Sequence, residues 1–403
     1  MSSCVDTEIL SLITQEEERQ QNTLNLIASE NYASACVRKP LSSVLTNKYA
    51  EGYPGKRYYA GCENADAIEQ CAIDRAKLLF GADHANVQPH SGSQANMAVY
   101  MTALAPGDTI MGMSLAEGGH LTHGHSVSFS GIFYRSHPYT VDRTTERLDY
   151  DAIQAQALKV KPKIIVTGAS AYSRTIDFKA FSDIAQSVDA VLLADIAHIA
   201  GFVVTGLHPS PVPHADFVTS TTHKTLRGPR GGLILCNHQY SEKIDKAVMP
   251  GIQGGPFMQV IAAKAIAFRE ALDPSFIEYQ KQVILNAKTL SSTLQGLGYR
   301  IVSGGTDNHL FIVDLTDKGI SGRDAERILS KAGITVSRSC IPFDPAKPWI
   351  TSGIRLGTPA VTTRGLKQNA MKQIGLWIHQ VLNKPHGDHS RVRQNLMTLF
   401  SKA

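Results

Sequence analysis

The sequence lacks the features that mark a membrane protein or a disulfide-stapled secreted protein. Its longest apolar stretch, Val191 to Val204, is roughly half of what a bilayer requires and contains Asp195 and His198. The first twenty residues are rich in acids and glutamines, where a signal peptide would be basic and then apolar. The six cysteines form no C-x-x-C pair. We therefore expect a cytoplasmic protein with reduced thiols and no membrane partner.

The sequence also has little excess charge and no dinucleotide-binding signature. Lys+Arg 40 against Asp+Glu 35 gives a net charge of +5, with no Lys/Arg-rich run. This balance argues against a nucleic-acid partner and is compatible with anionic small substrates. No G-x-G-x-x-G follows the first predicted strand, which excludes a Rossmann-type dehydrogenase.

The first two thirds of the chain show the alternation typical of an α/β domain. Apolar residues recur at helical spacing from Ala65 to Phe80, and Gly81 ends the pattern. Buried strands separated by helical patterns are predicted at 163–168, 190–194 and 216–220. Such strands form a mostly parallel sheet.

The last third has a different texture. Helical patterns at 258–272 and 275–294 precede strands at 309–315 and 334–336, a helix at 322–332 started by Ser321, and a closing helix at 365–382. With 403 residues, the chain exceeds what one core normally fills. We expect an N-terminal arm (1–20), a large domain (21–272) and a smaller α+β domain (273–403).

Lys224 is the first candidate catalytic residue. It follows a predicted buried strand and a threonine cluster, and it precedes a Gly/Pro-rich loop containing Arg227 and Arg230. Two cationic neighbours would lower the pKa of this amine and make it a nucleophile able to form a Schiff base. A surface lysine after a strand is the ordinary alternative.

Asp195 is the second candidate, and together with Lys224 it is more specific for a cofactor site than the lysine alone. It ends the apolar strand twenty-nine residues upstream of Lys224, where a carboxylate is costly without a partner. The protonated ring nitrogen of pyridoxal phosphate (PLP) is such a partner. His198, one turn further on, could hydrogen-bond the same carboxylate.

Two glycine-containing segments could supply backbone donors to a phosphate. Residues 91–96, Ser-Gly-Ser-Gln-Ala-Asn, run into a helical pattern, and such a helix N-terminus attracts anions. An ordinary capped helix has the same pattern. Residues 250–256 form the second glycine cluster.

The histidine-rich segment at 118–125 raises the question of a metal. His120, His123 and His125 loosely resemble a zinc site, but no carboxylate–histidine motif on a helix accompanies them. We expect no metal and favour stacking of His120 on an aromatic cofactor ring.

Five long motifs follow one known pattern: Leu-Ile-Ala-Ser-Glu-Asn (26–31), Thr-Asn-Lys-Tyr-Ala-Glu-Gly-Tyr-Pro-Gly-Lys-Arg-Tyr-Tyr (46–59), Val-Gln-Pro-His-Ser-Gly-Ser-Gln-Ala-Asn (87–96), Thr-Thr-His-Lys-Thr-Leu (221–226) and Thr-Ser-Gly-Ile-Arg-Leu-Gly-Thr-Pro-Ala (351–360). With them the chain resembles the serine hydroxymethyltransferase family from about Leu24 to the last predicted helix. The resemblance implies a fold-type I PLP enzyme, with a mostly parallel sheet of the seven-stranded kind in its large domain and an active site at a homodimer interface. In that family serine and tetrahydrofolate give glycine and 5,10-methylenetetrahydrofolate.

The resemblance also implies cofactor contacts. Lys224 matches the Schiff-base lysine, Asp195 the partner of the pyridine nitrogen and His120 the stacked imidazole. The remaining matches to cofactor contacts are Gly92, Ser93, Ser170, His198, Tyr49 and Gly255, of which Tyr49 and Gly255 come from the other subunit.

The substrate contacts follow in the same way. Arg355 matches the arginine that holds the substrate carboxylate by a bidentate fork. Glu51, donated by the partner subunit, matches the acid/base carboxylate near the substrate hydroxyl. Further matches to catalytic, substrate or folate contacts are His223, Ser29, Tyr59, Leu115, Gly119 and Leu121.

One segment departs from the family pattern. The family usually has Asn-x-Asn-Ser where this chain has Ser337, Arg338, Ser339 and Cys340. The second asparagine contacts the pteridine, and Ser339 is too short to offer the same paired donor and acceptor. Glu117, where bacterial relatives often carry histidine, is a lesser departure.

Several alternatives therefore stay open. A threonine-type aldolase with weak or no folate dependence, or an α-methylserine transferase with a remodelled folate site, would share the PLP machinery. A catalytically inactive homologue with a binding role would have no need of Lys224, Asp195 and Arg355 together.

Overall fold

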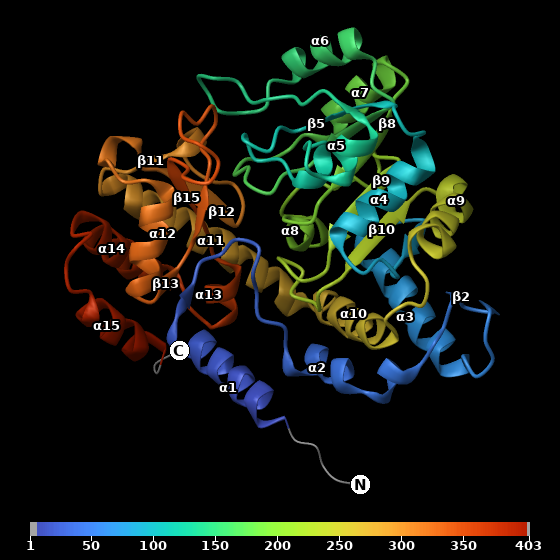
Figure 1. Cartoon of the computed structure of the whole chain (residues 1–403), viewed down its shortest axis with the longest axis horizontal. Coiled ribbons are helices and arrows are strands. Elements are labelled where there is room, and N and C mark those ends of the chain that lie inside the picture. The colour runs from blue at the N-terminus through green and yellow to red at the C-terminus, as the bar shows by residue number, and fades with distance from the viewer. Residues whose placement is uncertain (1–5, 401–403) are drawn as a thin grey trace.

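The computed structural model describes residues 6–400 (Figure 1). Cys4 and the first five residues of the predicted arm lie outside this range. The other five cysteines carry free thiols. Within the described residues no helix is long and apolar enough to cross a bilayer.

A seven-stranded sheet forms the centre of the larger part of the molecule. Its spatial order is β4 (His84–Asn86), β10 (Gly232–Cys236), β9 (Phe217–Thr221), β8 (Val191–Asp195), β7 (Ile164–Thr167), β5 (Thr109–Gly112) and β6 (Arg135–Ser136). The strands from β9 to β6 pair in parallel, and β10 pairs antiparallel with both β9 and β4. The predicted mostly parallel α/β sheet is confirmed.

Alternate residues of these strands enter two different cores. Ile164 and Val166 of β7 pack into one apolar cluster, whereas Ile165 between them packs into another on the opposite face. This two-residue period places helices on both faces of the sheet. The first cluster includes α4 (Gly92–Ala103), and the second includes α3 (Glu63–Phe80), α7 (Phe178–Ser187) and α10 (Met258–Ala271).

A smaller antiparallel sheet carries the C-terminal part of the chain. Its order is β11 (Arg300–Ile301), β12 (Leu310–Asp314), β15 (Gly353–Gly357) and β14 (Ser337–Ser339). The helices α11 (Pro274–Gly296), α12 (Gly322–Lys331) and α14 (Gln368–Asn383) contribute to its core. β1 (Leu24–Asn25) pairs in parallel with β13 (Ile334–Thr335), so the N-terminal segment packs against this part.

The remaining elements are short or peripheral. They are α2 (Ala35–Arg38), β2 (Gly52–Tyr53), β3 (Lys56–Arg57), α5 (Phe129–Phe133), α6 (Tyr150–Val160), α8 (Ala200–Val204), α9 (Ser241–Lys246) and α13 (Pro359–Thr363). The described part of the predicted polar arm lies in α1 (Thr7–Asn22), which runs two residues beyond the predicted end, buries none of its residues and lies beside α15 (Ser390–Phe400) (Figure 1).

The predicted helix at 365–382 corresponds to α14, but it does not close the chain. α15 follows it and packs Val392 and Leu396 into the core of the smaller sheet. Two apolar residues four positions apart are enough to anchor this helix, and they gave too weak a pattern to predict it.

Candidate functional site

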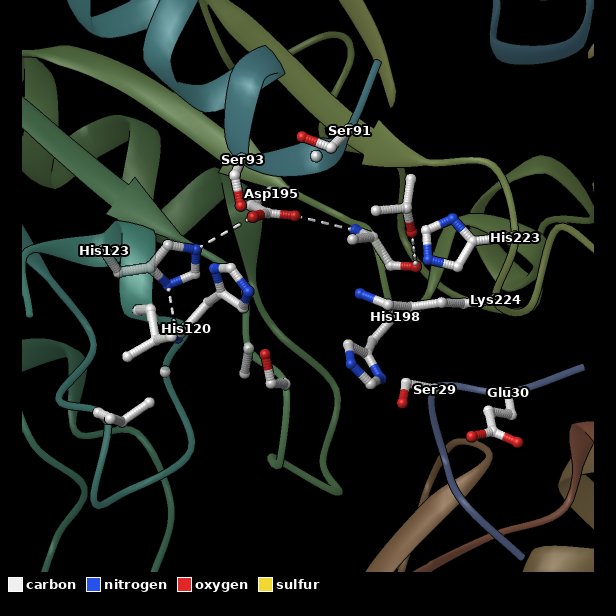
Figure 2. Close-up of a pocket in the computed structure, with 18 of the residues that line it drawn as sticks. Ser29, Glu30, Ser91, Ser93, His120, His123, Asp195, His198, His223 and Lys224 are labelled. Atoms are coloured by element: carbon white, nitrogen blue, oxygen red, sulfur yellow. Dashed lines mark hydrogen bonds and ion pairs between the residues drawn. The ribbon is translucent and has the colours of Figure 1, made fainter. Parts of the chain in front are cut away.

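A cavity of about 480 Å³ opens at the carboxyl ends of the parallel strands. Open α/β sheets bind ligands at this edge because the loops after neighbouring strands meet there. The loops after β5, β7, β8 and β9 all reach it. Thirteen predicted site residues line it: Ser29, Gly92, Ser93, Leu115, Gly119, His120, Leu121, Ser170, Asp195, His198, His223, Lys224 and Arg355. Figure 2 shows many of them pointing into the cavity.

Asp195, at the end of β8, has a full set of hydrogen-bond donors. Its Oδ2 accepts from Asn96 Nδ2 at 2.9 Å and lies 3.1 Å from His123 Nε2, and its Oδ1 accepts from the Ala197 N–H at 3.0 Å. Burial alone would raise the pKa of this carboxyl. The hydrogen bonds and the neighbouring imidazoles outweigh that cost and hold the pKa well below its usual range, so Asp195 is ionised.

His123 lies beside Asp195 in the cavity, a contact that the sequence did not predict. Its Nδ1 accepts the backbone N–H of His120 at 3.2 Å, so the ring proton resides on Nε2 and is donated to Asp195 (Figure 2). From the sequence, His123 was a candidate only for metal ligation. Its spacing from His120 could have indicated a shared turn, since both belong to the 3₁₀ turn at 121–123 and its cap.

The possible metal-ligand atoms of His120, His123 and Asp195 lie within 4.8 Å of one another, and His125 is not in this group. The hydrogen bonds account for the grouping. His120 Nδ1 lies 2.8 Å from Thr122 Oγ1, which leaves its ring at the cavity wall. Burial lowers the pKa of His120 to about 4, so the ring is neutral near pH 7.

Lys224 follows β9 and lies in the same cavity as Asp195, as the sequence predicts. Burial lowers the pKa of Lys224 to about 8; Asp195 opposes this shift, and Arg355 and Arg230 add to it. The expected contribution of Arg227 is wrong. The left-handed backbone of Arg227 directs its guanidinium over the Tyr279 ring, 4.5 Å from the centroid.

His198 lines the cavity but does not bond to Asp195, and that expectation is wrong. Its Nδ1 lies 3.3 Å from Nε2 of His309, which directly precedes β12 of the smaller sheet. Burial lowers the pKa of both rings, to about 3 for His309, so the pair is neutral. The Asp195 carboxylate is satisfied by the three other donors.

Arg355 is the residue of the smaller sheet that lines the cavity. It lies on β15, and its Nη1 donates to the Ser170 carbonyl at 2.6 Å across the two parts of the molecule. Burial lowers the pKa of Arg355 to about 10, so the group remains a cation near neutral pH. Ser29 arrives from the N-terminal segment, which is anchored beside β15 where the Gly357 N–H donates to the Leu26 carbonyl.

The segment 91–93 forms the start of helix α4 at the cavity wall. Ser91 is the N-cap, and its Oγ accepts the Gln94 N–H at 3.2 Å. A side chain at position 92 would meet the Thr221 methyl group at 2.7 Å, so glycine allows the close approach of helix and strand. The unpaired N–H groups of the first turn and the helix dipole favour an anion here.

The other four predicted residues gather elsewhere. Among the described residues that line the cavity there is no Tyr49, Glu51, Tyr59 or Gly255. Tyr49 and Tyr59 meet edge to face at 5.4 Å, and a side chain at Gly255 would contact the Tyr49 ring. The nearby Glu51 carboxylate raises the pKa of Tyr49. We name this group the aromatic cluster; both tyrosines are exposed.

The donor set of the cavity fits pyridoxal phosphate. An ionised carboxylate, a buried lysine, a neutral imidazole and a helix N-terminus surround one space, and the buried Nδ1 of His223 has no hydrogen-bond partner among the described residues. Fold and cavity together define a PLP-dependent enzyme of the α/β type. The family model for serine hydroxymethyltransferase matches residues 3–378, and the chain belongs to this family. The fold is therefore fold-type I, as the motifs predicted.

Proposed function

We propose that the chain binds PLP through Lys224 and converts serine and tetrahydrofolate reversibly to glycine and 5,10-methylenetetrahydrofolate. The observation that carries this proposal is the convergence of Lys224, Asp195 and Arg355, from two sheets, on one cavity. A buried amine, a carboxylate and a guanidinium together serve cofactor attachment, cofactor polarisation and substrate-carboxylate binding.

PLP, when bound, supplies an electron sink for the carbanion that remains after Cα–Cβ cleavage. Asp195, ionised and held by His123, keeps a proton on the ring nitrogen. His120 would stack on the cofactor ring, and the N–H groups at 91–93 would hold its phosphate. Ser170 lies beside Arg355 at the cavity wall and contributes its carbonyl to the position of the guanidinium.

The substrate is oriented by charge. Arg355 binds the amino-acid carboxylate by a bidentate fork, because its guanidinium remains cationic with a pKa of about 10. Ser29, His198 and His223 supply polar contacts around it. Glu51 exchanges a proton with the substrate hydroxyl, and Leu115, Gly119 and Leu121 contact the folate.

The chain acts as a homodimer in this proposal. Glu51, Tyr49, Tyr59 and Gly255 reach the cavity of the partner subunit. This is supported by their clustering outside the lining of the chain's own cavity, with both tyrosines exposed. The free thiols of the described cysteines support a cytoplasmic location. The proposed domain division at 272/273 is supported by the boundary between α10 and α11. β1, which precedes this boundary in the sequence, nevertheless pairs with β13 of the smaller domain.

A second candidate is a PLP aldolase with weak folate binding. Ser339 favours it, because its hydroxyl donates to the Cys340 carbonyl at 3.1 Å. The hydroxyl proton is therefore engaged at the end of β14. This serine occupies the position of the pteridine-contacting asparagine in the family pattern.

Spectra and product analysis test these proposals together. The purified protein with PLP should develop a visible absorption band that is lost in Lys224→Ala, and serine should yield glycine only when tetrahydrofolate is added. Folate-independent cleavage of allo-threonine, with no folate-dependent conversion of serine to glycine, would favour the second candidate. Absence of any band in the wild-type protein would contradict both.

A further inference from the structure

Lys264 is a fully buried lysine that the proposed chemistry does not use. It lies on α10, is 1% exposed, and directs its Nζ to three backbone carbonyls: Val87 at 2.6 Å, Gly232 at 2.7 Å and Pro89 at 3.1 Å. An ammonium has three N–H donors, so this arrangement uses all of them. Burial lowers the pKa of Lys264 to about 7. The charge of Glu69 opposes that shift, and three carbonyl acceptors around one Nζ favour the ammonium form.

The three carbonyls belong to the scaffold of the phosphate-binding turn. Val87 and Pro89 lie between β4 and the N-cap of α4, directly before residues 91–93. Gly232 begins β10, directly after the loop that carries His223 and Lys224. Its N–H also donates to the Pro89 carbonyl at 2.9 Å. One buried ammonium therefore joins the segment before the turn to the end of the lysine loop.

Few other side chains could take over this role. Gln253 holds the same segment from another side, since its Oε1 accepts the His90 N–H and its Nε2 donates to the Gln88 carbonyl. Neither bond involves Val87 or Pro89. Without the ammonium, the Val87 carbonyl would lose a short charge-assisted partner in a buried place. The charge also reaches the turn, because after burial itself Lys264 is the next cause that lowers the pKa of His90.

We propose that Lys264 is a positioning residue that fixes the 91–93 turn for the cofactor phosphate and thereby sets the preference of the site for pyridoxal phosphate over pyridoxal. The inference rests on the proposed function. A helix N-terminus binds an anion well only when its N–H groups are already fixed in place, so a loosened turn should lose affinity for the phosphate more than for the rest of the cofactor.

The test compares two ligands that differ only in the phosphate. The dissociation constants of PLP and pyridoxal are measured with apo-protein for the wild type, Lys264→Met and Lys264→Gln, together with the thermal stabilisation given by inorganic phosphate. Losing buried charge-assisted bonds should weaken PLP binding by about 10- to 100-fold, with a much smaller change for pyridoxal. Stabilisation by phosphate should shrink in parallel. The glutamine variant keeps two N–H donors and should lie between methionine and wild type.

Gly231→Ala displaces the ammonium without removing it. A Cβ at position 231 would meet Lys264 Cε at 2.5 Å and Nζ at 3.0 Å, and the backbone there is not left-handed. This variant should reduce the PLP preference in the same direction, and it decides the question if neither Lys264 variant folds. Arg75→Met is the matched control, because Arg75 on α3 also donates to α10, at the Ala265 carbonyl, but makes no bond to the segment at 87–93.

The outcomes separate the two levels of the proposal. A selective loss of PLP over pyridoxal, in the Lys264 variants or in Gly231→Ala but not in Arg75→Met, supports the positioning role. Equal losses for both ligands, or unchanged affinities, overturn it. A wild-type protein that binds PLP no better than pyridoxal, and is not stabilised by phosphate, contradicts the proposed function itself.

Discussion

Burial, more than neighbouring charge, sets the chemistry of the individual cationic residues in the cavity. Burial is the largest cause that lowers the pKa of Lys224, to about 8. It also lowers the pKa of Arg355, to about 10. The lysine therefore has a sizeable neutral fraction near neutral pH, whereas the arginine remains charged. One site thus holds a nucleophilic amine and a permanent cation a short distance apart.

The reaction of apo-protein with PLP should follow the titration of Lys224. Only the neutral amine attacks a carbonyl, so the rate of band formation should rise with pH and approach a plateau above a midpoint near pH 8. A small exposed amine with a pKa near the ordinary 10.5 serves as the reference. Stopped-flow absorbance measures the rate, and Lys224→Ala should show no band. A rate that still climbs tenfold per pH unit above pH 9 would contradict the lowered pKa.

Ser339 provides the second prediction at this scale. Ser339→Asn should restore a paired amide donor and acceptor toward the pteridine and lower KM for tetrahydrofolate by about 10- to 100-fold, the equivalent of roughly 1–3 kcal/mol. Cleavage of allo-threonine without folate should not change. Arg338→Asn is the matched control, because it adds the same amide on the opposite face of β14. A wild-type KM in the ordinary range for the family, unmoved by Ser339→Asn, would refute the prediction.

At the scale of elements, close backbone contact joins the N-terminal segment to β15. Gly357 pairs its N–H with the Leu26 carbonyl, and a Cβ on Gly357 would overlap the backbone of Ala28. The segment then continues to Ser29 at the cavity wall, while β15 carries Arg355. The spacing of Ser29 and Arg355, the two proposed substrate-binding residues, therefore depends on a glycine outside the cavity.

Gly357→Ala should separate the two segments. Overpacking against backbone typically costs about 1–3 kcal/mol, so we expect a lower free energy of unfolding and a raised KM for serine. Denaturant unfolding and steady-state kinetics measure the two effects. Gly296→Ala, in α11, is the control, since its Cβ would meet nothing within 4 Å and alanine favours a helix. Equal stability and unchanged KM in Gly357→Ala would show that the contact does not position Ser29.

Elements with a strong local pattern could be predicted from the sequence, and those that depend on distant partners could not. The strands at 164–167 and 191–195 are apolar up to their last residues, Thr167 and Asp195, and α3 ends at the left-handed Gly81 as its pattern indicated. β1 and β13 have two residues each and exist only through their mutual pairing. The hydrogen bond of His198 to His309 likewise joins residues 111 positions apart.

The same distinction explains the site. Asp195 and Lys224 could be predicted together because parallel neighbouring strands end at one edge. His123 could not, since its role depends on which ring nitrogen receives the His120 N–H. Arg227 and Arg230 are near neighbours in sequence, yet only Arg230 lowers the pKa of Lys224 because the backbone of Arg227 turns away.

At the scale of the whole molecule, two surfaces divide the proposed machinery. The cavity contains the residues proposed to bind the cofactor and the substrate carboxylate, whereas the aromatic cluster contains the proposed acid/base residue Glu51. Exposed tyrosines beside a glycine-rich turn are an unusual surface for a monomer and a common one for an interface. Two copies related by a two-fold axis would complete two equivalent sites at once.

Co-expression of differently tagged chains tests this division. A purified heterodimer of Glu51→Gln with Lys224→Ala should contain one site with both wild-type residues and one with neither. We expect about half of the wild-type turnover per dimer. The matched control pairs a wild-type chain with the double variant, which carries the same two substitutions in one chain. There each site has one defect, so turnover should nearly vanish. If Glu51 acted in its own chain, the control would be half active and the first heterodimer inactive, which is the reverse pattern.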